Sequence, residues 1–364
     1  PLYPLTLLFL WVPGEYFWNI FVVVRWIIFA SGAYLLASRC FRFNFAGSSI
    51  FVLTFVFALF HARWINHAFL NGMAAGIWYL YFTLALLNTD RKLHHIRYYT
   101  GLAWGQVIST FSVVTCGFPE ASLIVALATI LIVPFAVYRC AKVDHKLALQ
   151  TLGLILVTNL LGVAIASPQI FALVEMVQQS SDTFRSSHAL NQYDVNVIDF
   201  FLGKVSLNGL QLPDPNIHVF GFIPIFLFLS GLYFALSTSR KKTWGYAGLT
   251  TCGLFFLFKN FPVFGNYLVP IDLLHRGFSS IPVVQQMWFT SYSFPLILLF
   301  FSFFAGSGAH SLSTLRLDNT KSSPLKKALW IIVLMIIVFS YKLLNFIYIL
   351  IYNLTFMNIK FSPY

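Results

Sequence analysis

Long apolar stretches separated by short basic loops are the feature of this sequence that most restricts how the chain folds. A helix of about 20 apolar residues crosses the roughly 30 Å hydrocarbon core of a membrane. Two of the apolar stretches are shorter than this, so the predicted number of membrane spans ranges from nine to eleven. We predict an all-α polytopic membrane protein with about ten transmembrane helices. The stretches are residues 16–38, 46–60, 68–88, 99–116, 121–139, 147–166, 217–238, 245–260, 289–308 and 328–351.

The positions of lysine and arginine give these spans an orientation. Threading the stretches alternately through a bilayer leaves Arg25 and Lys342 inside spans and puts most of the 23 Lys and Arg residues in loops on one face. Cytoplasmic loops are enriched in these residues, so we predict that this face is cytoplasmic. Its basic residues are Arg39, Arg42, Arg91, Lys92, Arg97, Arg139, Lys142, Lys146, Arg240, Lys241, Lys242, Arg316, Lys321, Lys326 and Lys327.

The composition agrees with a protein that lies in lipid. Apolar residues make up 59% of the chain and charged residues 9%, whereas soluble domains carry about 25% charged residues. The net charge of +12 lies mainly on the predicted cytoplasmic loops, where it orients the spans and meets anionic lipid headgroups, so we infer no nucleic-acid partner from it. The four cysteines are scattered and predict neither a disulfide nor a zinc site. We treat residues 1–364 as a single polytopic membrane domain.

Two long segments on the predicted outer face hold most of the acidic residues. They are residues 167–217 and 261–288, and loops of such length in a compact domain commonly carry function. Ser167 and Pro168 resemble a helix cap followed by a first-turn proline, which predicts a separate short amphipathic helix on the outer interface. The second segment has a similar plan. Residues 311–327 read as a polar cytoplasmic linker.

Arg25 is a charge inside the first predicted span. Such a residue costs at least about 2.5–3.5 kcal/mol unless it faces protein or water, so we expect it to point into the bundle. It is a candidate ligand for an anionic group such as a lipid phosphate. The alternatives are that it snorkels to the interface or pairs with an acid of an outer loop.

A second group of candidate phosphate ligands lies in the outer segments. His275 and Arg276, with Lys259 nearby, form a cationic cluster, and Arg185 belongs to the first segment. Arginine can hold a phosphate through two parallel charge-assisted hydrogen bonds. The alternative is that these residues anchor the loops at the membrane surface.

Three outer carboxylates are candidates for catalysis. Glu175, Asp194 and Asp199 could accept a proton from an attacking hydroxyl or bind a divalent metal ion. Solvated surface positions are the alternative for each. His61 and His67 are six residues apart, a separation that does not put two ligands on one helical face, so we predict no metal site there.

Several short motifs have the order found in one family of membrane enzymes. The chain resembles the YfhO-like branch of the GT-C membrane glycosyltransferases over most of its length. The motifs are Pro-Leu-Tyr-Pro-Leu at 1–5, Ala-Ser-Pro-Gln at 166–169, Glu-Met-Val-Gln-Gln-Ser-Ser at 175–181, His-Val-Phe-Gly-Phe-Ile-Pro at 218–224, Phe-Pro-Val-Phe-Gly at 261–265 and Ala-Gly-Ser-Gly-Ala at 305–309.

The resemblance implies an inverting transferase that takes a sugar from a polyprenyl-phosphate donor outside the cytoplasm. It implies a bacterial cytoplasmic membrane, with the long segments on the periplasmic or extracellular side. Glu175, Arg185, Asp272 and Arg276 would belong to the donor cavity. The catalytic acid of such enzymes lies in the first outer loop, which no residue here matches, so we expect that loop to precede Pro1.

Two other functions fit the same sequence. The chain could be a non-catalytic scaffold or accessory subunit of a larger membrane complex, which the missing acid favours. It could also be a lipid or solute transporter, for which paired half-helices with ionisable groups near the membrane centre are expected. Arg25 and Lys342 come closest to that pattern.

Overall fold

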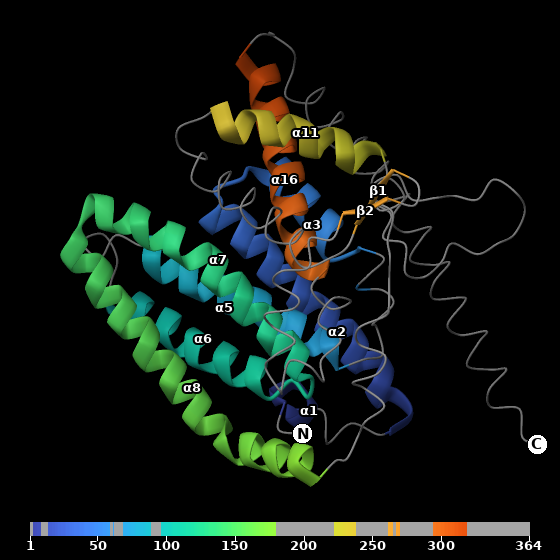
Figure 1. Cartoon of the computed structure of the whole chain (residues 1–364). Helices are drawn as coiled ribbons and strands as arrows, with labels where there is room; N and C mark the ends of the chain where they lie inside the picture. The colour runs from blue at the N-terminus through green and yellow to red at the C-terminus, as the bar shows by residue number, and fades with distance from the viewer. Residues whose placement is uncertain are drawn as a thin grey trace, which may run out of the picture.

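Helices form almost all of the structure, a computed structural model that describes residues 3–8, 14–58, 61, 68–88, 96–179, 222–237, 261–264, 267–269 and 294–318. Figure 1 shows α5 to α8 stacked side by side, with α2 and α3 between this stack and the crossed pair α11 and α16. The elements are α1 (Pro4–Leu8), α2 (Gly14–Leu35), the π-helical turn η1 (Leu36–Cys40), α3 (Phe45–Phe55), α5 (Phe69–Asn88), α6 (Ile96–Val114), α7 (Pro119–Val143), α8 (His145–Gln179), α11 (Phe222–Ser237), β1 (Phe261–Phe264), β2 (Tyr267–Val269) and α16 (Phe294–Asp318).

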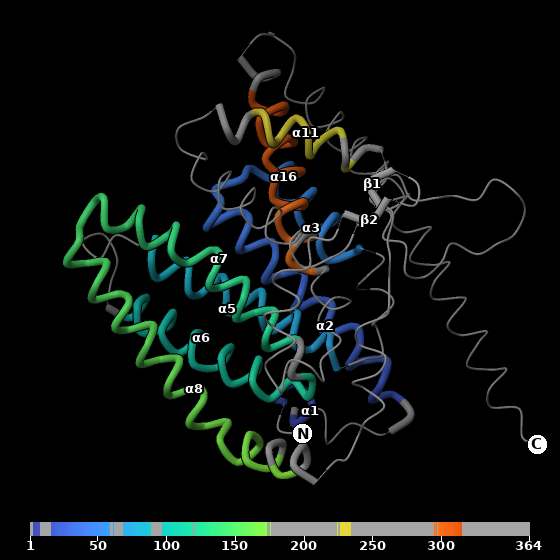
Figure 2. Tube along the Cα trace, viewed as in Figure 1, coloured from blue at the N-terminus to red at the C-terminus, as the bar shows by residue number. Residues whose placement is uncertain are grey.

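Four of the described helices are long and apolar enough to cross a membrane. They cover Tyr16–Cys40, Phe69–Asn88, Ala121–Val143 and His145–Ala172, which match the predicted spans 16–38, 68–88, 121–139 and 147–166. These helices indicate a membrane protein. They belong to a helical bundle formed by the described residues of the first half of the chain, in which α7 and α8 run antiparallel on either side of a sharp turn (Figure 2).

The remaining predicted spans are covered in part. Helices α3, α6, α11 and α16 occupy the predicted stretches 46–60, 99–116, 217–238 and 289–308 at least in part. The stretches 245–260 and 328–351 lie outside the described residues. The total of ten spans therefore stays a prediction.

The expected break at Ser167 and Pro168 was wrong. Helix α8 runs without interruption from His145 to Gln179 and keeps Pro168 inside it. Membrane helices tolerate proline, although it lacks the N–H of one helical hydrogen bond. Here the next residue, Gln169, donates its side-chain amide to the carbonyl oxygen of Thr115 at 3.3 Å. This bond ties α8 to the end of α6 directly beyond the proline.

The other two predicted connecting segments also differ from expectation. Helix α16 continues to Asp318, so the first part of the predicted linker 311–327 is helical. In the second outer segment, where a short helix was expected, β1 and β2 pair as antiparallel strands with Phe261 opposite Val269. The rest of that segment, and residues 180–217 of the first, lie outside the described residues.

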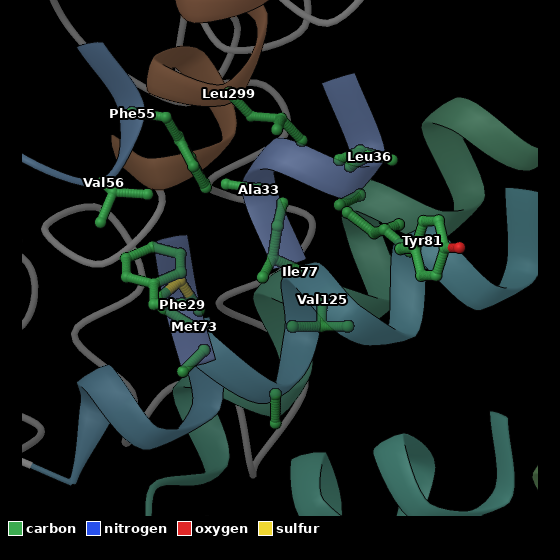
Figure 3. Close-up of a cluster of buried hydrophobic side chains, with 14 of the residues drawn as sticks. Phe29, Ala33, Leu36, Phe55, Val56, Met73, Ile77, Tyr81, Val125 and Leu299 are labelled. Carbon is green, nitrogen blue, oxygen red and sulfur yellow. The ribbon is translucent and has the colours of Figure 1, made fainter. Parts of the chain in front are cut away.

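The core lies where α2 and α5 meet α3, α7 and α16. In Figure 3, Phe29 and Ala33 of α2 lie among Ile77 of α5, Phe55 of α3 and Leu299 of α16, and all five are buried. The indole N–H of Trp78 also donates to the Ile28 carbonyl oxygen at 2.8 Å, which links α5 to α2. Lipid tails are as apolar as these side chains, so close packing and hydrogen bonds hold such helices together.

The helix ends that carry basic residues gather at one end of the bundle. Arg39 lies in the last turn of η1, and Lys142 lies in the last turn of α7. The thiol of Cys40 donates to the carbonyl oxygen of Tyr81 at 3.8 Å, which places the end of α5 there as well. Tyr3 and Asn71 lie at the other end. This alternation agrees with the predicted threading, and the compartment that each end faces stays a prediction.

Candidate functional site

Arg25 is the one charged side chain that is fully buried in the described part of the chain. It is 1% exposed and lies nine residues, or about 14 Å, from the start of its span at Tyr16. Its Nη1 donates to Oδ1 of Asn71 at 2.9 Å. Its guanidinium carbon also lies 5.1 Å from the ring centre of Phe21, one turn earlier in α2. The positive charge is thus held by an amide oxygen and an aromatic face.

The guanidinium reaches the level of the first turn of α5. Asn71 is the third residue of that helix, so its amide lies only about 3 Å past the helix start. The side chains of a helix point toward its N-terminus, which explains how Arg25 spans the distance from its deeper backbone position. The charge therefore lies near the boundary of the apolar layer, on the end opposite the basic loops.

Tyr3 lies against the same group. Its hydroxyl donates to the backbone carbonyl oxygen of Asn71 at 3.5 Å, and the residue is 4% exposed. Burial raises the pKa of the Tyr3 hydroxyl above its ordinary value, and the positive charge of Arg25 offsets part of this rise. Tyr3 is therefore a neutral hydrogen-bond donor at physiological pH. We call Tyr3, Phe21, Arg25 and Asn71 the arginine cluster.

His61 is buried one layer further along α2. Its Nδ1 lies 2.7 Å from the carbonyl oxygen of Phe55, which makes Nδ1 the protonated nitrogen because a carbonyl can only accept. The ring packs edge-on against Phe29 and Phe55. Among the described residues, no group of three or more His, Cys, Asp or Glu side chains could hold a metal ion.

The structure places two of the predicted site residues. Arg25 points into the bundle, as expected from its position in a span. Glu175 is exposed on the last turns of α8, six residues or about 9 Å beyond Gln169, which contacts the end of α6. Its predicted catalytic role stays a prediction. The other candidates, Asp194, Asp199, Arg185, Lys259, His275 and Arg276, and Asp272 with them, lie outside the described residues.

A partly buried amide network was missed by the sequence analysis. Asn159 of α8 accepts hydrogen bonds through Oδ1 from Gln106 Nε2 at 3.0 Å and from Thr110 Oγ1 at 2.8 Å. Its Nδ2 donates to the hydroxyl of Tyr79 at 3.3 Å, and Thr83 donates to Gln106 Oε1 at 3.1 Å. The network joins α5, α6 and α8.

The missed residues share one sequence signal. Asn71, Gln106 and Asn159 are amides inside otherwise apolar stretches. Such side chains in membrane helices face other helices and bond across them. Comparison with known proteins adds no assignment: no family model matches the chain, and no curated protein or solved structure matches it.

Proposed function

We propose that this chain is a GT-C-like glycosyltransferase that uses a polyprenyl-phosphate-linked sugar at the end of the bundle where the arginine cluster lies. The observation that carries the proposal is Arg25, a buried charge held at the edge of the apolar layer. Ionisable residues within membrane spans are costly and usually mark functional sites. The motif resemblance supplies the reaction and the donor class.

The physical requirements of such a donor agree with this location. A polyprenyl phosphate keeps its tail in the bilayer and its charged head at the interface, so its site needs a cation at that depth. Arg25 supplies one, and Asn71 fixes the orientation of the guanidinium. Glu175, on the exposed end of α8, is the described carboxylate that the proposal assigns to the donor cavity.

The same burial favours a second candidate, a non-catalytic subunit of a membrane complex. In that case Arg25 would only tie α2 to α5 through Asn71 and would contact no substrate. The packing of Phe21 against the guanidinium supports this reading. The two candidates differ in whether removing the charge of Arg25 changes lipid binding.

Equilibrium binding of a polyprenyl phosphate to the full chain in lipid nanodiscs tests the proposal. A charge-assisted hydrogen bond contributes about 1.5–3 kcal/mol, so Arg25→Gln should weaken binding about tenfold or more. Arg25→Lys keeps the charge and should retain part of the affinity. Arg97→Gln, which changes an exposed cation at the other end of the bundle, is the matched control.

A loss of lipid binding must be distinguished from a loss of folding. Thermal unfolding of each variant shows whether it is folded before binding is measured. If folded Arg25→Gln binds the lipid as well as the parent chain, the enzyme proposal loses its main support and the accessory-subunit candidate gains. Arg276→Ala should likewise weaken binding if the outer cluster holds the phosphate, and unchanged binding would remove Arg276 from the site.

A further inference from the structure

Asn44 fastens the start of α3 to α16 through three polar groups. Its side-chain oxygen accepts a hydrogen bond from the backbone N–H of Gly47 at 3.0 Å, which caps the helix. Its backbone N–H donates to Nδ1 of His310 at 3.0 Å, and its side-chain Nδ2 donates to the hydroxyl of Ser313 at 2.7 Å. One residue therefore couples the first turn of α3 to the contact between α3 and α16. We call Asn44, His310 and Ser313 the histidine latch.

The bond from Asn44 fixes where the proton of His310 lies. A backbone N–H can only donate, so Nδ1 of the ring accepts and carries no proton. The proton of the neutral ring is therefore on Nε2. A second proton can enter only at Nδ1, and the N–H formed there would face the N–H of Asn44. The bond thus exists with the neutral ring alone, and histidines ordinarily gain the second proton at about pH 6.5.

The backbone before Asn44 holds its N–H in place. Arg42 has a φ of 57° and turns the chain between η1 and α3, while Phe43 beside it is buried. The ring centre of Phe43 lies 6.0 Å from that of His310. A Cβ built on Gly47 would lie 2.9 Å from the Cβ of His310. The histidine ring is therefore held against the first turn of α3.

The titratable groups around the histidine latch come mainly from α7 and from the turn before α3. Helix α3 itself carries no titratable side chain, and the one on α11, Tyr233, is 70% exposed. The others are Tyr138, Arg139, Cys140 and Lys142 in the last turns of α7, Arg39 and Arg42 before α3, and Arg316 and Asp318 further along α16. A second proton at Nδ1 would therefore break the bond from Asn44 and gain no carboxylate from α3, α11 or this end of α7.

We propose that the histidine latch is a pH-sensitive switch, in which protonation of His310 releases the start of α3 from α16. The proton comes from water, binds the lone pair of Nδ1 and returns to water when the pH rises, so the change is reversible. The bond from Asn44 to Ser313 remains, which limits the opening to the first turn of α3. His310 is half-buried and lies two residues beyond the predicted span 289–308, which favours exchange of its proton with water. This proposal does not depend on the proposed sugar transfer.

Hydrogen–deuterium exchange of the full chain in lipid nanodiscs, read on peptides from the start of α3, tests the switch. In His310→Asn the side-chain Oδ1 is as far from the backbone as Nδ1 of histidine, and it can accept a hydrogen bond without titrating. At about pH 7.5 the parent chain and His310→Asn should exchange at similar rates, because both hold the N–H of Asn44. At about pH 5.5 the parent chain should exchange about fivefold faster, as expected for the loss of one hydrogen bond. Each comparison is made at one pH, which removes the effect of pH on the intrinsic exchange rate.

Two further variants separate the switch from other effects of pH. His310→Gln carries its amide one bond further out, so it lacks an acceptor at the place of Nδ1 and should exchange fast at both pH values. His145→Asn removes an exposed histidine at the start of α8 and should match the parent chain.

Three results would overturn the switch. The first is equal exchange of the parent chain and His310→Asn at about pH 5.5. The second is slowing of exchange by His145→Asn as large as that by His310→Asn. Should His310→Asn not fold, the parent chain and His310→Gln must still differ at about pH 7.5 and converge at about pH 5.5, and a failure to converge is the third.

Discussion

The contact between α3 and α16 depends on two glycines that face each other. A Cβ built on Gly306 of α16 would lie 2.8 Å from the carbonyl oxygen of Gly47 in α3, and one on Gly47 would lie 2.7 Å from the carbonyl oxygen of Gly306. Ordinary contacts begin at 3.4 Å. Gly306→Ala must therefore open the gap by about 0.6 Å, the difference between 3.4 and 2.8 Å, and a backbone carbonyl cannot move without its helix.

The loss of stability caused by overpacking can be separated from the intrinsic preference of alanine for a helix. Overpacking of this kind costs about 1–3 kcal/mol, whereas alanine gains about 1 kcal/mol over glycine inside a helix. Gly153 of α8 is helical and exposed, and a Cβ there meets nothing within 4 Å. Gly153→Ala should therefore show the gain alone. The free energies of unfolding of Gly153→Ala and Gly306→Ala should therefore differ by the cost of overpacking, about 1–3 kcal/mol.

Unfolding of the full chain in mixed micelles, followed by circular dichroism, measures that difference. Gly306→Ala should unfold at a lower denaturing-detergent fraction than Gly153→Ala. Gly101→Ala in α6, which also has open space around its Cβ, serves as a second control. Equal unfolding of Gly306→Ala and the two controls would mean that α3 and α16 do not approach as closely as the structure shows.

Two other residues give predictions of different kinds. Asn159→Leu removes the acceptor and donor at the centre of the amide network and should destabilise the chain by about 1–3 kcal/mol in the same assay, whereas Leu160→Ala on the exposed side of α8 should have little effect. Tyr3 has a raised pKa, so its stabilising contribution is fully present below the unfolded-state pKa of about 10 and is lost as the pH rises above it. Tyr3→Phe should therefore lose less stability than the parent chain between pH 9 and 11, and parallel pH curves for the two proteins would contradict this.

The long spans could be predicted because their signal is local. Uninterrupted apolar runs specify helices of membrane length, and the predicted stretches 16–38, 68–88 and 121–139 lie within helices or within a residue or so of them. Helix ends were less predictable. Ser167 and Pro168 have the residue types of a helix start, but α8 continues through them, and Gln169 bonds to Thr115, directly after α6. A tertiary contact of this kind leaves no pattern in the local sequence.

The candidate site could be predicted only in part, for a related reason. Arg25 was identifiable because a charge in a span is rare. Its partner Asn71 was not, because an amide in an apolar run indicates a helix contact but not which helix it contacts. Likewise, nothing in the sequence marks Arg42 as having positive φ. That conformation follows from the burial of the residues on either side of it.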